Sequence, residues 1–449
     1  MFTVRRGTSV RSISVLGCGY LGVTHAACMA ELGHQVVAVD TDDAKVAALT
    51  AGEVPFYEPG LQELVDRHLR TGRLHFTTSY SEAAAQADIH FICVGTPQGA
   101  DGAADLGYVD SVVDALAPWL DRECLVVGKS TVPVGTAARI AHRLVDRAPG
   151  KGAVLTAWNP EFLREGHGIA DTLQPDRIVL GVQSPQAEKL LRDLYAPLAD
   201  AGVPILVTDF ATAELAKAAA NSFLATKISF INALAEVCEA TTADVVELAE
   251  VLALDRRIGG EFLKPGIGFG GGCLPKDLRA LQARTRELGV GDSLAFLSEV
   301  DAVNLRRREK AAHMIRQQCG GTLEGKRIAA LGISFKPNSD DIRDSPALHV
   351  ARRLSVEGAY VSVYDPKAMK NAQRCHPELH YEPDVKSACL GADVVTVLTE
   401  WQEFQEIDPW ALGSVVAQRQ VVDGRNTLKR TDWERAGWVY GALGRRIRS

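Results

Sequence analysis

Short apolar runs alternate with helical patterns through the first half of the chain. The runs are four to six residues long and carry many Val and Ile residues, which is typical of strands that a parallel sheet buries on both faces. Between them, apolar residues recur at helical spacing, for example in 25–32 and 43–49. The predicted strands of this half are 12–16, 35–39, 89–94, 124–129, 154–158 and 177–180. Such alternation predicts a parallel, doubly wound sheet.

The pattern changes at about Asp209, where the chain becomes rich in Ala, Leu and Glu at helical spacing. A second helical region is expected from Leu274 to about Gln318. Strand and helix patterns then alternate again, with predicted strands at 327–331, 360–364, 393–398 and 420–422. We therefore predict an α/β protein in which two Rossmann-like, doubly wound domains are joined by a central helical region with a long helix. The expected domains are 1–208, 209–318 and 319–449.

The long helix of the middle region carries apolar residues on several faces. A helix of this kind is buried inside a large protein or against another subunit. We therefore expect this helix to contribute to a subunit interface.

Composition narrows the class of partner. The net charge of -7 and the pI near 5.9 argue against nucleic acid, which requires a basic surface. No apolar run is long enough for a membrane span. Arg5, Arg6 and Arg11 precede an apolar stretch, but its four glycines and one histidine favour strand, turn and helix over a signal peptide. We expect a cytoplasmic protein in which residues 1–10 form a loose leader.

The nine cysteines are scattered and never form a C-x-x-C pair, so neither a disulfide framework nor a metal site is expected. Eight of them are expected to pack in the core as small apolar residues.

A dinucleotide fingerprint follows the first predicted strand. Gly17, Gly19 and Gly22 form G-x-G-x-x-G between a strand and a helix, where the backbone can approach a pyrophosphate at the positive end of the helix. Asp40 ends the next strand, 23 residues after Gly17, at the usual distance for a carboxylate that binds the ribose. An acid at this place repels a 2'-phosphate, which favours NAD over NADP. The second Rossmann-like half has one glycine, Gly332, in the corresponding turn, so it is expected to hold a different nucleotide, if any.

A reactive cysteine is predicted in the segment GFGGGCLPKD. Four glycines, Gly268 and Gly270 to Gly272, indicate a close approach of the backbone just before Cys273, and Pro275 indicates that a helix starts there. A helix N-terminus stabilises a thiolate, and Lys276 adds positive charge. The alternative is an ordinary core cysteine before a capped helix, with Asp277 as a first-turn acid.

Three further clusters have polar residues suited to chemistry. Lys217 and Asn221 are four residues apart on one face of the long helix, and Glu161 and Glu165 share the same spacing in NPEFLREG. In KSTVPVGT, the residues after Lys129 end a strand at the carboxyl edge of the sheet, where ligands bind. Taken singly, these clusters could also be a solvated lysine, a helix cap and a turn.

Taken together, eleven segments in order resemble the UDP-glucose/GDP-mannose dehydrogenase family over nearly the whole chain. They are VLGCGYLG, FYEPGL, VGTP, KSTVPVGT, NPEFLREG, ELAKAAANSFLATKISFINALAE, RRIG, GFGGGCLPKD, FKPNSDDIRDSPA, YDP and DGRN.

The resemblance implies two successive NAD-linked oxidations at C6 of a nucleotide sugar, from alcohol to aldehyde to acid. Cys273 would attack the aldehyde to give a thiohemiacetal, then a thioester that water hydrolyses. Lys217 and Asn221 would stabilise the oxyanion, while Asp277, Glu161 and Thr131 would activate the water. Either Lys217 or Asp277 could be the base of the alcohol step.

NPEFLREG and KPGIGFGGG favour UDP-glucose as the substrate and UDP-glucuronate as the product, again by resemblance. GDP-mannose or a UDP-N-acetylhexosamine remains the alternative, and Leu274 after the cysteine also occurs in the GDP-mannose branch. A non-catalytic sensor of nucleotide sugar and NAD is the alternative from another class. Many members carry Ser at the position of Gly272.

The same resemblance assigns the binding residues and a homodimer. Arg257 would reach the substrate of the partner subunit, and together with Lys264, Lys336 and Arg425 it would neutralise the diphosphate. The implied substrate-binding residues are Glu161, Phe162, Leu163, Arg164, Glu165, Lys217, Asn221, Arg257, Lys264, Gly266, Ile267, Gly268, Phe269, Gly270, Phe335, Lys336 and Arg425. The implied cofactor-binding residues are Gly17, Gly19, Tyr20, Leu21, Gly22, Asp40, Lys45, Thr96, Ser130, Thr131, Glu165, Cys273, Lys276 and Arg343.

Overall fold

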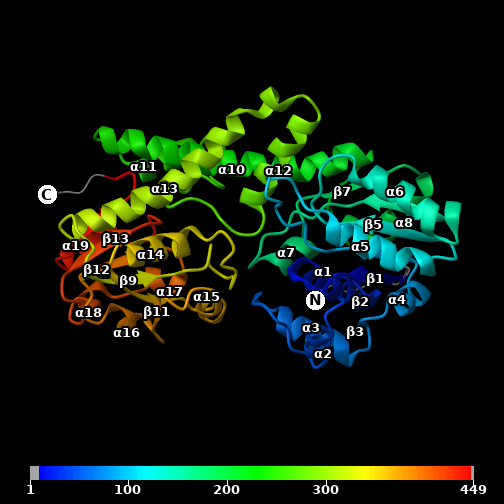
Figure 1. Ribbon diagram of the computed structural model, residues 1–449, viewed down its shortest axis with the longest axis horizontal. Coiled ribbons are helices and arrows are strands. Elements are labelled where there is room, and N and C mark those ends of the chain that lie inside the picture. The colour runs from blue at the N-terminus through cyan, green and yellow to red at the C-terminus, as the bar shows by residue number, and fades with distance from the viewer. Residues whose placement is uncertain (1–9, 446–449) are drawn as a thin grey trace. The chain divides into compact units, whose positions relative to one another are not determined.

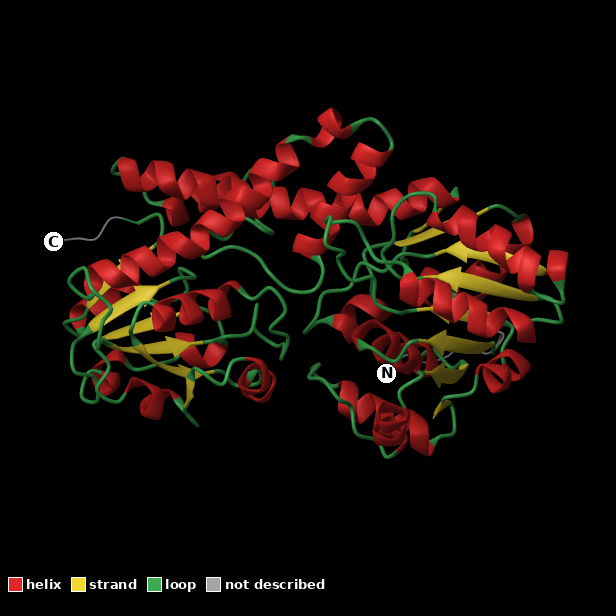
Figure 2. Cartoon of the chain, viewed as in Figure 1, coloured by secondary structure: helices red, strands yellow, loops and turns green. Residues whose placement is uncertain are grey.

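A computed structural model describes residues 10–445 as an α/β protein with two sheets (Figure 1; Figure 2). The chain divides into two compact units. The first unit contains the chain up to Ala220 together with Arg279–Gly289, and the second contains Asn221–Leu278 and the chain from Val290 onward. Of the predicted leader 1–10, all but Val10 lies outside the described residues.

The first unit is built on an eight-stranded sheet with the order β3-β2-β1-β4-β5-β6-β7-β8. Its first six strands are parallel and follow the 3-2-1-4-5-6 order of a dinucleotide-binding fold. The strands are β1 (Ser12–Leu16), β2 (Gln35–Val39), β3 (Leu74–Thr77), β4 (Ile89–Ile92), β5 (Cys124–Gly128), β6 (Val154–Trp158), β7 (Ile178–Val182) and β8 (Ile205–Thr208).

Helices cover both faces of this sheet because its strands are apolar on both faces. In β2, Val36 and Ala38 belong to one core with residues of α1, α3 and α8. Val37 and Val39 belong to the other core, with residues of α4, α5 and α6. The helices are α1 (Tyr20–Glu31), α2 (Asp43–Thr50), α3 (Leu61–Arg70), α4 (Tyr80–Gln86), α5 (Gly107–Leu116), α6 (Thr136–Arg147), α7 (Gly168–Leu173), α8 (Pro185–Leu194) and α9 (Ala196–Asp200), with 3-10 turns at Ala117–Trp119 and Lys151–Ala153.

The second unit contains a six-stranded parallel sheet with the order β11-β10-β9-β12-β13-β14, which repeats the same 3-2-1-4-5-6 pattern. Ile328 and Ala330 of β9 enter a core with α13 and α14, whereas Ala329 and Leu331 enter a core with α16 and α19. The strands are β9 (Arg327–Leu331), β10 (Tyr360–Tyr364), β11 (His380–Tyr381), β12 (Val394–Val397), β13 (Gln420–Asp423) and β14 (Val439–Ala442).

Long helices connect the two sheets along the chain. Helix α10 (Phe210–Ala240) is a single helix of 31 residues, which confirms the predicted long helix of the middle region. The others are α11 (Val245–Ala253), α12 (Leu274–Glu287), a 3-10 turn at Gly291–Leu294, α13 (Phe296–Gln318), α14 (Pro346–Val356), α15 (Met369–Cys375), α16 (Val385–Cys389), α17 (Gln402–Gln405), α18 (Pro409–Leu412) and α19 (Arg430–Arg435).

The predicted fold class is confirmed, with three differences in detail. Strands β3, β8, β11 and β14 were not predicted, since they are short and lie toward the sheet edges, where burial is one-sided or partial. Strand β7 runs antiparallel to β6, so the connection 159–177, which holds only α7, stays at one edge of the sheet. The helical region after Leu274 breaks at Gly289, where φ is 75°, into α12 and α13.

The cysteines differ from expectation at one position. All nine are free thiols, and seven are buried, but Cys375 is exposed as well as Cys273. Cys375 is the last residue of α15, a short helix whose one buried residue is Ala372, so packing reaches only one turn of it. Cys375 is therefore a surface residue and not part of the core.

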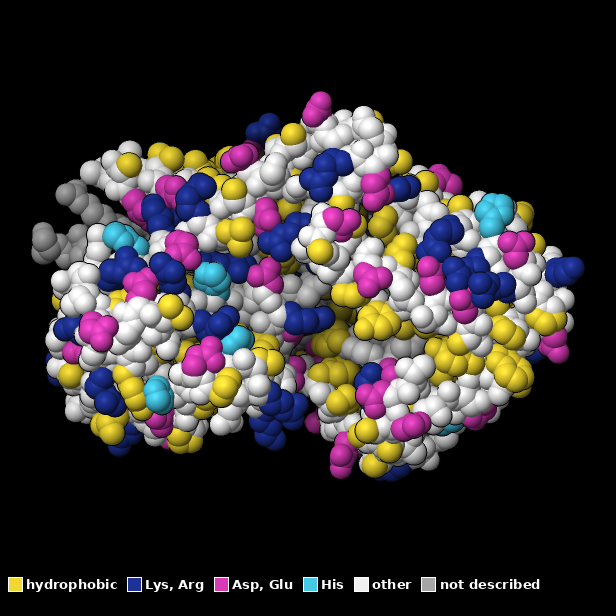
Figure 3. All heavy atoms as spheres, viewed as in Figure 1, with side chains coloured by type: hydrophobic (Ala, Val, Ile, Leu, Met, Phe, Trp, Pro, Cys, Tyr) yellow, Lys and Arg dark blue, Asp and Glu magenta, His cyan; other side chains and the backbone are white. Residues whose placement is uncertain are grey.

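The distribution of charged side chains on the surface agrees with the composition, which is not basic. On the face that Figure 3 shows, basic and acidic side chains are interspersed over each unit, and no broad basic area is seen there. Among the described residues, no helix is long and apolar enough to cross a membrane.

Candidate active site

The first unit forms a dinucleotide cradle at the carboxyl end of β1. Gly17 has φ of 102° and its amide donates to Val39 O at 2.7 Å, which turns the chain directly into α1. A Cβ on Gly22 would lie 1.8 Å from Gly17 O, so only glycine permits this close packing of turn and helix. A Cβ on Gly19, the residue before α1, would meet nothing within 4 Å. The turn therefore leaves open space beside the helix N-terminus, as the fingerprint requires for a pyrophosphate.

Asp40 faces this turn from the end of β2. Its carboxylate accepts hydrogen bonds from Cys18 N at 2.8 Å, from Asp42 N at 3.1 Å and from Lys45 Nζ at 2.9 Å. Burial alone would raise the pKa of Asp40, but these hydrogen bonds and the charge of Lys45 hold it below its ordinary value. Asp40 is thus a fixed anion beside the cradle, which suits a ribose hydroxyl and repels a 2'-phosphate.

The second sheet has the same turn after its first strand, but the acid at the end of the neighbouring strand is bonded within the protein. Gly332 N donates to Tyr364 O at 2.8 Å, as Gly17 does to its own neighbouring strand. Asp365, at the end of β10, accepts from Ile333 N at 2.9 Å and from Ser334 N at 3.0 Å. Its oxygens also accept from the side chains of Ser334 and Trp401 and from two following amides. Both oxygens of this carboxylate are therefore occupied by the protein itself.

The turns after β4 and β5 are tied together at the edge that carries the cradle. Thr96 Oγ1 donates to Thr131 O at 2.8 Å, and Ser130 Oγ donates to Val94 O at 2.6 Å. The hydroxyl of Ser130 is therefore used to hold the turn. The two side chains that sequence analysis placed in the cofactor site thus have structural partners in neighbouring loops.

Glu161 and Lys217 form a buried ion pair in the first unit. Lys217 Nζ lies 3.0 Å from Glu161 Oε1, and both side chains are nearly inaccessible, at 5% and 11% exposure. The other oxygen of Glu161 accepts from Leu163 N at 2.6 Å, which fixes the carboxylate in its turn. The ring of Phe162 lies 5.6 Å from Lys217 Nζ. Residues from β6's connection and from α10, far apart in sequence, therefore share one buried charge pair.

The end of the NPEFLREG segment is fixed by hydrogen bonds to Glu58, a residue for which the sequence predicted no role. Glu58, which is buried, accepts from Gly166 N at 2.6 Å and from Gly168 N at 2.7 Å, and Tyr20 OH donates to it. Its segment, FYEPGL, was recognised only by resemblance. The side chain of Arg164 pairs with Asp171 at 2.8 Å.

In the second unit, Cys273 lies at the start of a helix, as predicted. Helix α12 begins at Leu274, and the carbonyl of Cys273 accepts its first helical hydrogen bond, from Asp277 N at 2.9 Å. The thiol-bearing residue is exposed, in contrast to the seven buried cysteines. The helix dipole and Lys276 both favour a thiolate at this position.

Asp277 lies one turn after Cys273 and is buried. Its Oδ2 accepts from Asn221 Nδ2 at 2.7 Å, and its Oδ1 accepts from Lys276 Nζ at 2.5 Å. Asn221, which was predicted to contact an oxyanion, is therefore hydrogen-bonded to Asp277, which was predicted to activate water.

The glycines before Cys273 approach the segment 335–346 of the same unit. A Cβ on Gly270 would lie 2.2 Å from Asp344 O, and one on Gly271, where φ is 83°, would lie 2.7 Å from the ring of Phe335. A Cβ on Gly272 would lie 2.4 Å from Cζ of Arg343. The predicted close approach is thus to the protein's own chain, and Arg343 fills the space beside Gly272.

Side chains of α13 form hydrogen bonds with the backbone of the same loop. Asn304 Oδ1 accepts from Phe269 N at 2.7 Å and its Nδ2 donates to Phe269 O at 3.0 Å, so one side chain pairs with both backbone groups. Arg307 Nε donates to Gly266 O at 3.1 Å, and Asn232 Oδ1 accepts from Gly266 N at 2.9 Å. The loop leading to Cys273 is therefore rigidly positioned by buried side chains that the sequence analysis did not single out.

The four predicted diphosphate-binding cations differ in their surroundings. Arg425 donates to Leu398 O at 2.8 Å and to Gly268 O at 2.8 Å, and it lies 3.2 Å from Glu400. Lys336 Nζ lies 5.5 Å from the ring centre of Phe335, and Lys264 is exposed. Arg257 is 88% exposed and pairs with Asp255 at 2.6 Å. Arg425 thus supports the glycine loop, whereas Lys264 and Arg257 face solvent.

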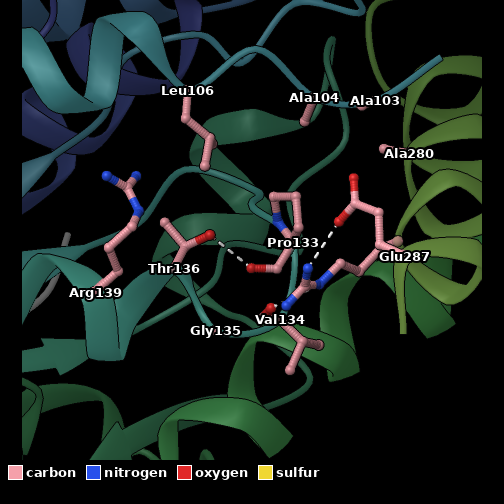
Figure 4. A pocket seen from close by; sticks show the side chains of 11 residues that line it. Ala103, Ala104, Leu106, Pro133, Val134, Gly135, Thr136, Arg139, Ala280 and Glu287 are labelled. Carbon is pink, nitrogen blue, oxygen red and sulfur yellow. Dashed lines mark hydrogen bonds and ion pairs between the residues drawn. The ribbon is translucent and has the colours of Figure 1, made fainter. Parts of the chain in front are cut away.

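A hollow of about 220 Å³ lies next to the turn that follows Thr131 (Figure 4). The start of α6 forms one wall and α12 another, with the Arg284–Glu287 pair at 2.7 Å and Thr136 Oγ1 donating to Pro133 O at 2.7 Å. Glu214 already accepts from Gly135 N at 2.8 Å and from Ala137 N at 2.6 Å. The amides of this helix start are therefore satisfied by the protein's own carboxylate.

Comparison with protein families assigns all three parts of the chain. Residues 11–199 match the NAD binding domain of the UDP-glucose/GDP-mannose dehydrogenase family, residues 211–306 match its central domain, and residues 329–430 match its UDP binding domain.

Individual relatives agree with these matches. A UDP-glucose 6-dehydrogenase of Rhizobium meliloti (strain 1021) is 40% identical over 437 residues, covering 96% of this chain and 99% of that protein. The solved UDP-glucose dehydrogenase of the archaeon Pyrobaculum islandicum has a TM-score of 0.91 at 38% identity, covering 99% of this chain and 100% of that one. The UDP-D-ManNAc dehydrogenase of Pyrococcus horikoshii has a TM-score of 0.84 at 26% identity, covering 97% and 99%.

Proposed function

The chain belongs to the UDP-glucose/GDP-mannose dehydrogenase family, and on that premise we propose that it oxidises UDP-glucose at C6 to UDP-glucuronate. The observation that carries this proposal is the exposed Cys273 at the N-terminus of α12, behind a rigid glycine loop. A thiol in this position can attack an aldehyde carbon, and oxidation of the resulting thiohemiacetal leads through a thioester to the acid.

The cofactor cradle fits NAD, because the glycine turn leaves room beside α1 and Asp40 presents a fixed carboxylate. NAD, when bound, supplies the acceptor for the hydride that leaves C6 in each oxidation. Gly17, Gly19 and Gly22 would hold its pyrophosphate, and Asp40 would orient its ribose.

Cys273 carries the covalent part of the proposed mechanism. Its Sγ forms a bond to the aldehyde carbon, and the carbonyl electron pair moves to oxygen to give a thiohemiacetal. At the oxidation level of the acid, the sugar is bound to Cys273 as a thioester. Water adds to that carbon, the C–S bond breaks, and the thiolate leaves stabilised by the start of α12.

The polar residues around the two buried charge pairs have complementary roles in this proposal. The ammonium of Lys217 and the amide of Asn221 stabilise the negative charge on the carbonyl oxygen. Asp277 accepts the proton of the attacking water, helped by Glu161 and Thr131. Each carboxylate is held by hydrogen bonds at 2.5–3.0 Å, so neither must reorganise during the reaction.

We propose UDP-glucose and not another nucleotide sugar as the substrate. The relatives named for UDP-glucose reach 40% and 38% identity, whereas the dehydrogenase named for UDP-D-ManNAc reaches 26%. The test measures NADH release with UDP-glucose, GDP-mannose and UDP-N-acetylmannosamine under the same conditions. We expect turnover with UDP-glucose at the highest kcat/KM. Turnover with GDP-mannose alone would overturn the substrate, and no NADH with any sugar would favour a sensor.

A homodimer is the second part of the proposal. Phe223, Phe230 and Val237 of α10 are spaced seven residues apart and are 67%, 55% and 56% exposed. Seven residues are nearly two helical turns, so the three side chains form one apolar stripe. Val251 of α11 and Leu254, which follows that helix, are also exposed, and hydrophobic side chains are visible over α10 and α11 (Figure 3). Such a surface requires a partner.

A second copy of the chain covers this stripe in our proposal, and the exposed Arg257 then extends to the partner's substrate. The oligomer is measured by light scattering for the wild type and for Phe230→Glu. We expect a dimer that Phe230→Glu weakens, together with a raised KM for UDP-glucose in Arg257→Ala. A wild type active as a strict monomer would exclude this role for Arg257.

The cytoplasm is the proposed place of action. Cys273 must stay reduced to react, and the cytoplasm keeps thiols reduced. Cell fractionation with activity measurement is the test, and activity recovered outside the cytoplasmic fraction would contradict it.

A further inference from the structure

Lys129 is a buried lysine of the first unit that contributes to the charge of the site but has no role in the mechanism proposed above. Lys129 follows β5 directly and is only 6% exposed. Its Nζ donates to Asn159 Oδ1 at 3.0 Å, at the end of the neighbouring strand β6. An ammonium is costly to bury beside neutral partners, so its retention calls for a reason.

The position of Lys129 is set by a closed hydrogen-bond network. Tyr195 OH donates to the same oxygen of Asn159 at 2.6 Å, and Asn159 Nδ2 donates to Val179 O at 2.9 Å. The backbone of Lys129 donates to Ile92 O at 3.0 Å. Hydrogen bonds to residues of strands β4 to β7 and their ends thus fix the ammonium beside the carboxyl ends of β5 and β6.

The charges that face Lys129 belong to the proposed active site. Burial disfavours the protonated form of Lys129, the charge of Glu161 favours it, and the charge of Lys217 opposes it. The imidazole of His25 is kept neutral, because burial and then the charge of Lys129 lower its pKa. Two ammonium groups therefore act on one carboxylate, and the cluster carries one excess positive charge when all three are ionised.

The excess charge matters because an isolated ion pair is nearly neutral. Glu161 lies 3.0 Å from Lys217 and would cancel most of its field at a substrate oxygen. Lys129 donates to Asn159, two residues before Glu161 in the chain, and its positive charge offsets part of the charge of that carboxylate. The field of Lys217 then remains positive toward the substrate.

We propose that Lys129 is a positioning residue that supplies a buried positive charge behind the Glu161–Lys217 pair, so that Lys217 can stabilise the oxyanion of the sugar. This inference rests on the proposed function of the Glu161–Lys217 pair. It assigns a reaction-related role to a residue that touches neither substrate nor cofactor.

The test measures the pH profile of kcat/KM for UDP-glucose oxidation in Lys129→Met and Lys129→Gln. Removing a cation makes it easier for the site to take up a proton, so the acidic limb of the profile moves to higher pH by about one unit. At neutral pH we expect kcat to fall about tenfold while KM changes little. Lys129→Gln keeps a donor toward Asn159, so it carries the test if Lys129→Met does not fold. Lys129→Arg retains the charge and should leave the limb near its wild-type position.

Tyr195→Phe is the matched control, because it removes a hydrogen bond to the same oxygen of Asn159 without changing any charge. We expect its melting temperature to fall and its pH profile to superimpose on that of the wild type. Profiles of Lys129→Met and Lys129→Gln that superimpose on the wild type would overturn the inference, and so would an equal displacement in Tyr195→Phe. A wild type without UDP-glucose turnover would instead overturn the proposed function.

Discussion

The side-chain amide of Asn221 donates a 2.7 Å hydrogen bond to Oδ2 of Asp277. Asn221 comes from α10 and Asp277 from the first turn of α12, so two helices define the orientation of one buried carboxylate. With Lys276 on its other oxygen, this carboxylate is fixed in place one turn from Cys273.

We predict that Asp277→Asn blocks thioester hydrolysis more than it blocks oxidation. The amide keeps the shape of the side chain but cannot take a proton from water. Rapid-mixing experiments should show a burst of two NADH per active site, one from each oxidation, followed by a steady rate lowered by about 10² to 10⁴. Mass spectrometry of the quenched protein should detect the sugar acid on Cys273. A lowered rate without any burst would show that Asp277 acts earlier.

Cys273→Ser should abolish acid formation with little effect on substrate affinity. Serine retains the size of the side chain, but its hydroxyl is a far weaker nucleophile near neutral pH than a thiolate. We expect kcat for UDP-glucuronate to drop by about 10³ or more. Calorimetric titration with UDP-glucose should give a Kd within a few-fold of the wild type. Turnover to the acid near the wild-type rate would exclude the thioester mechanism.

Asp40→Ala should weaken NAD binding and relax the discrimination against NADP. The change removes the carboxylate held by Cys18 N and Lys45 and leaves Lys45 available to a 2'-phosphate. We expect KM for NAD to rise about tenfold and the kcat/KM ratio of NAD to NADP to fall. Lys45→Ala serves as the comparison, since it should not improve the use of NADP. An unchanged cofactor ratio in Asp40→Ala would place the ribose elsewhere.

The free energy of unfolding should depend on pH through Lys129. Burial lowers the pKa of Lys129 to about 8, whereas an unfolded lysine titrates at about 10.4. Between these values the unfolded chain binds more protons than the folded one, so stability rises with pH and is lowest below about 8. Denaturant titrations from pH 7 to 10 should show this rise in the wild type relative to Lys129→Met. Parallel curves for the two proteins would mean that Lys129 titrates normally.

Much of the fold followed from local pattern. Strands β1, β2, β6, β9 and β10 have the bounds that periodicity alone predicted, because buried strands of a parallel sheet are continuous apolar runs. The start of α12 after Cys273 was predicted from Pro275 and Asp277 in its first turn. Short edge strands such as β11 were missed, since two residues carry no periodic signal.

What the sequence by itself determined is which residue types stand at which places along the predicted elements: the glycine turn, Asp40, Lys217, Glu161 and Cys273. Those identities depend on local backbone geometry and spacing, which a linear chain displays. Only the tertiary structure decided which groups meet. It placed Glu161 against Lys217, Asn221 against Asp277, Phe335 and Arg343 against the glycines, and Lys129 inside the sheet edge. These partners are between 30 and 71 residues apart in the chain. The charged ones among them interact strongly only because folding removes the water between them.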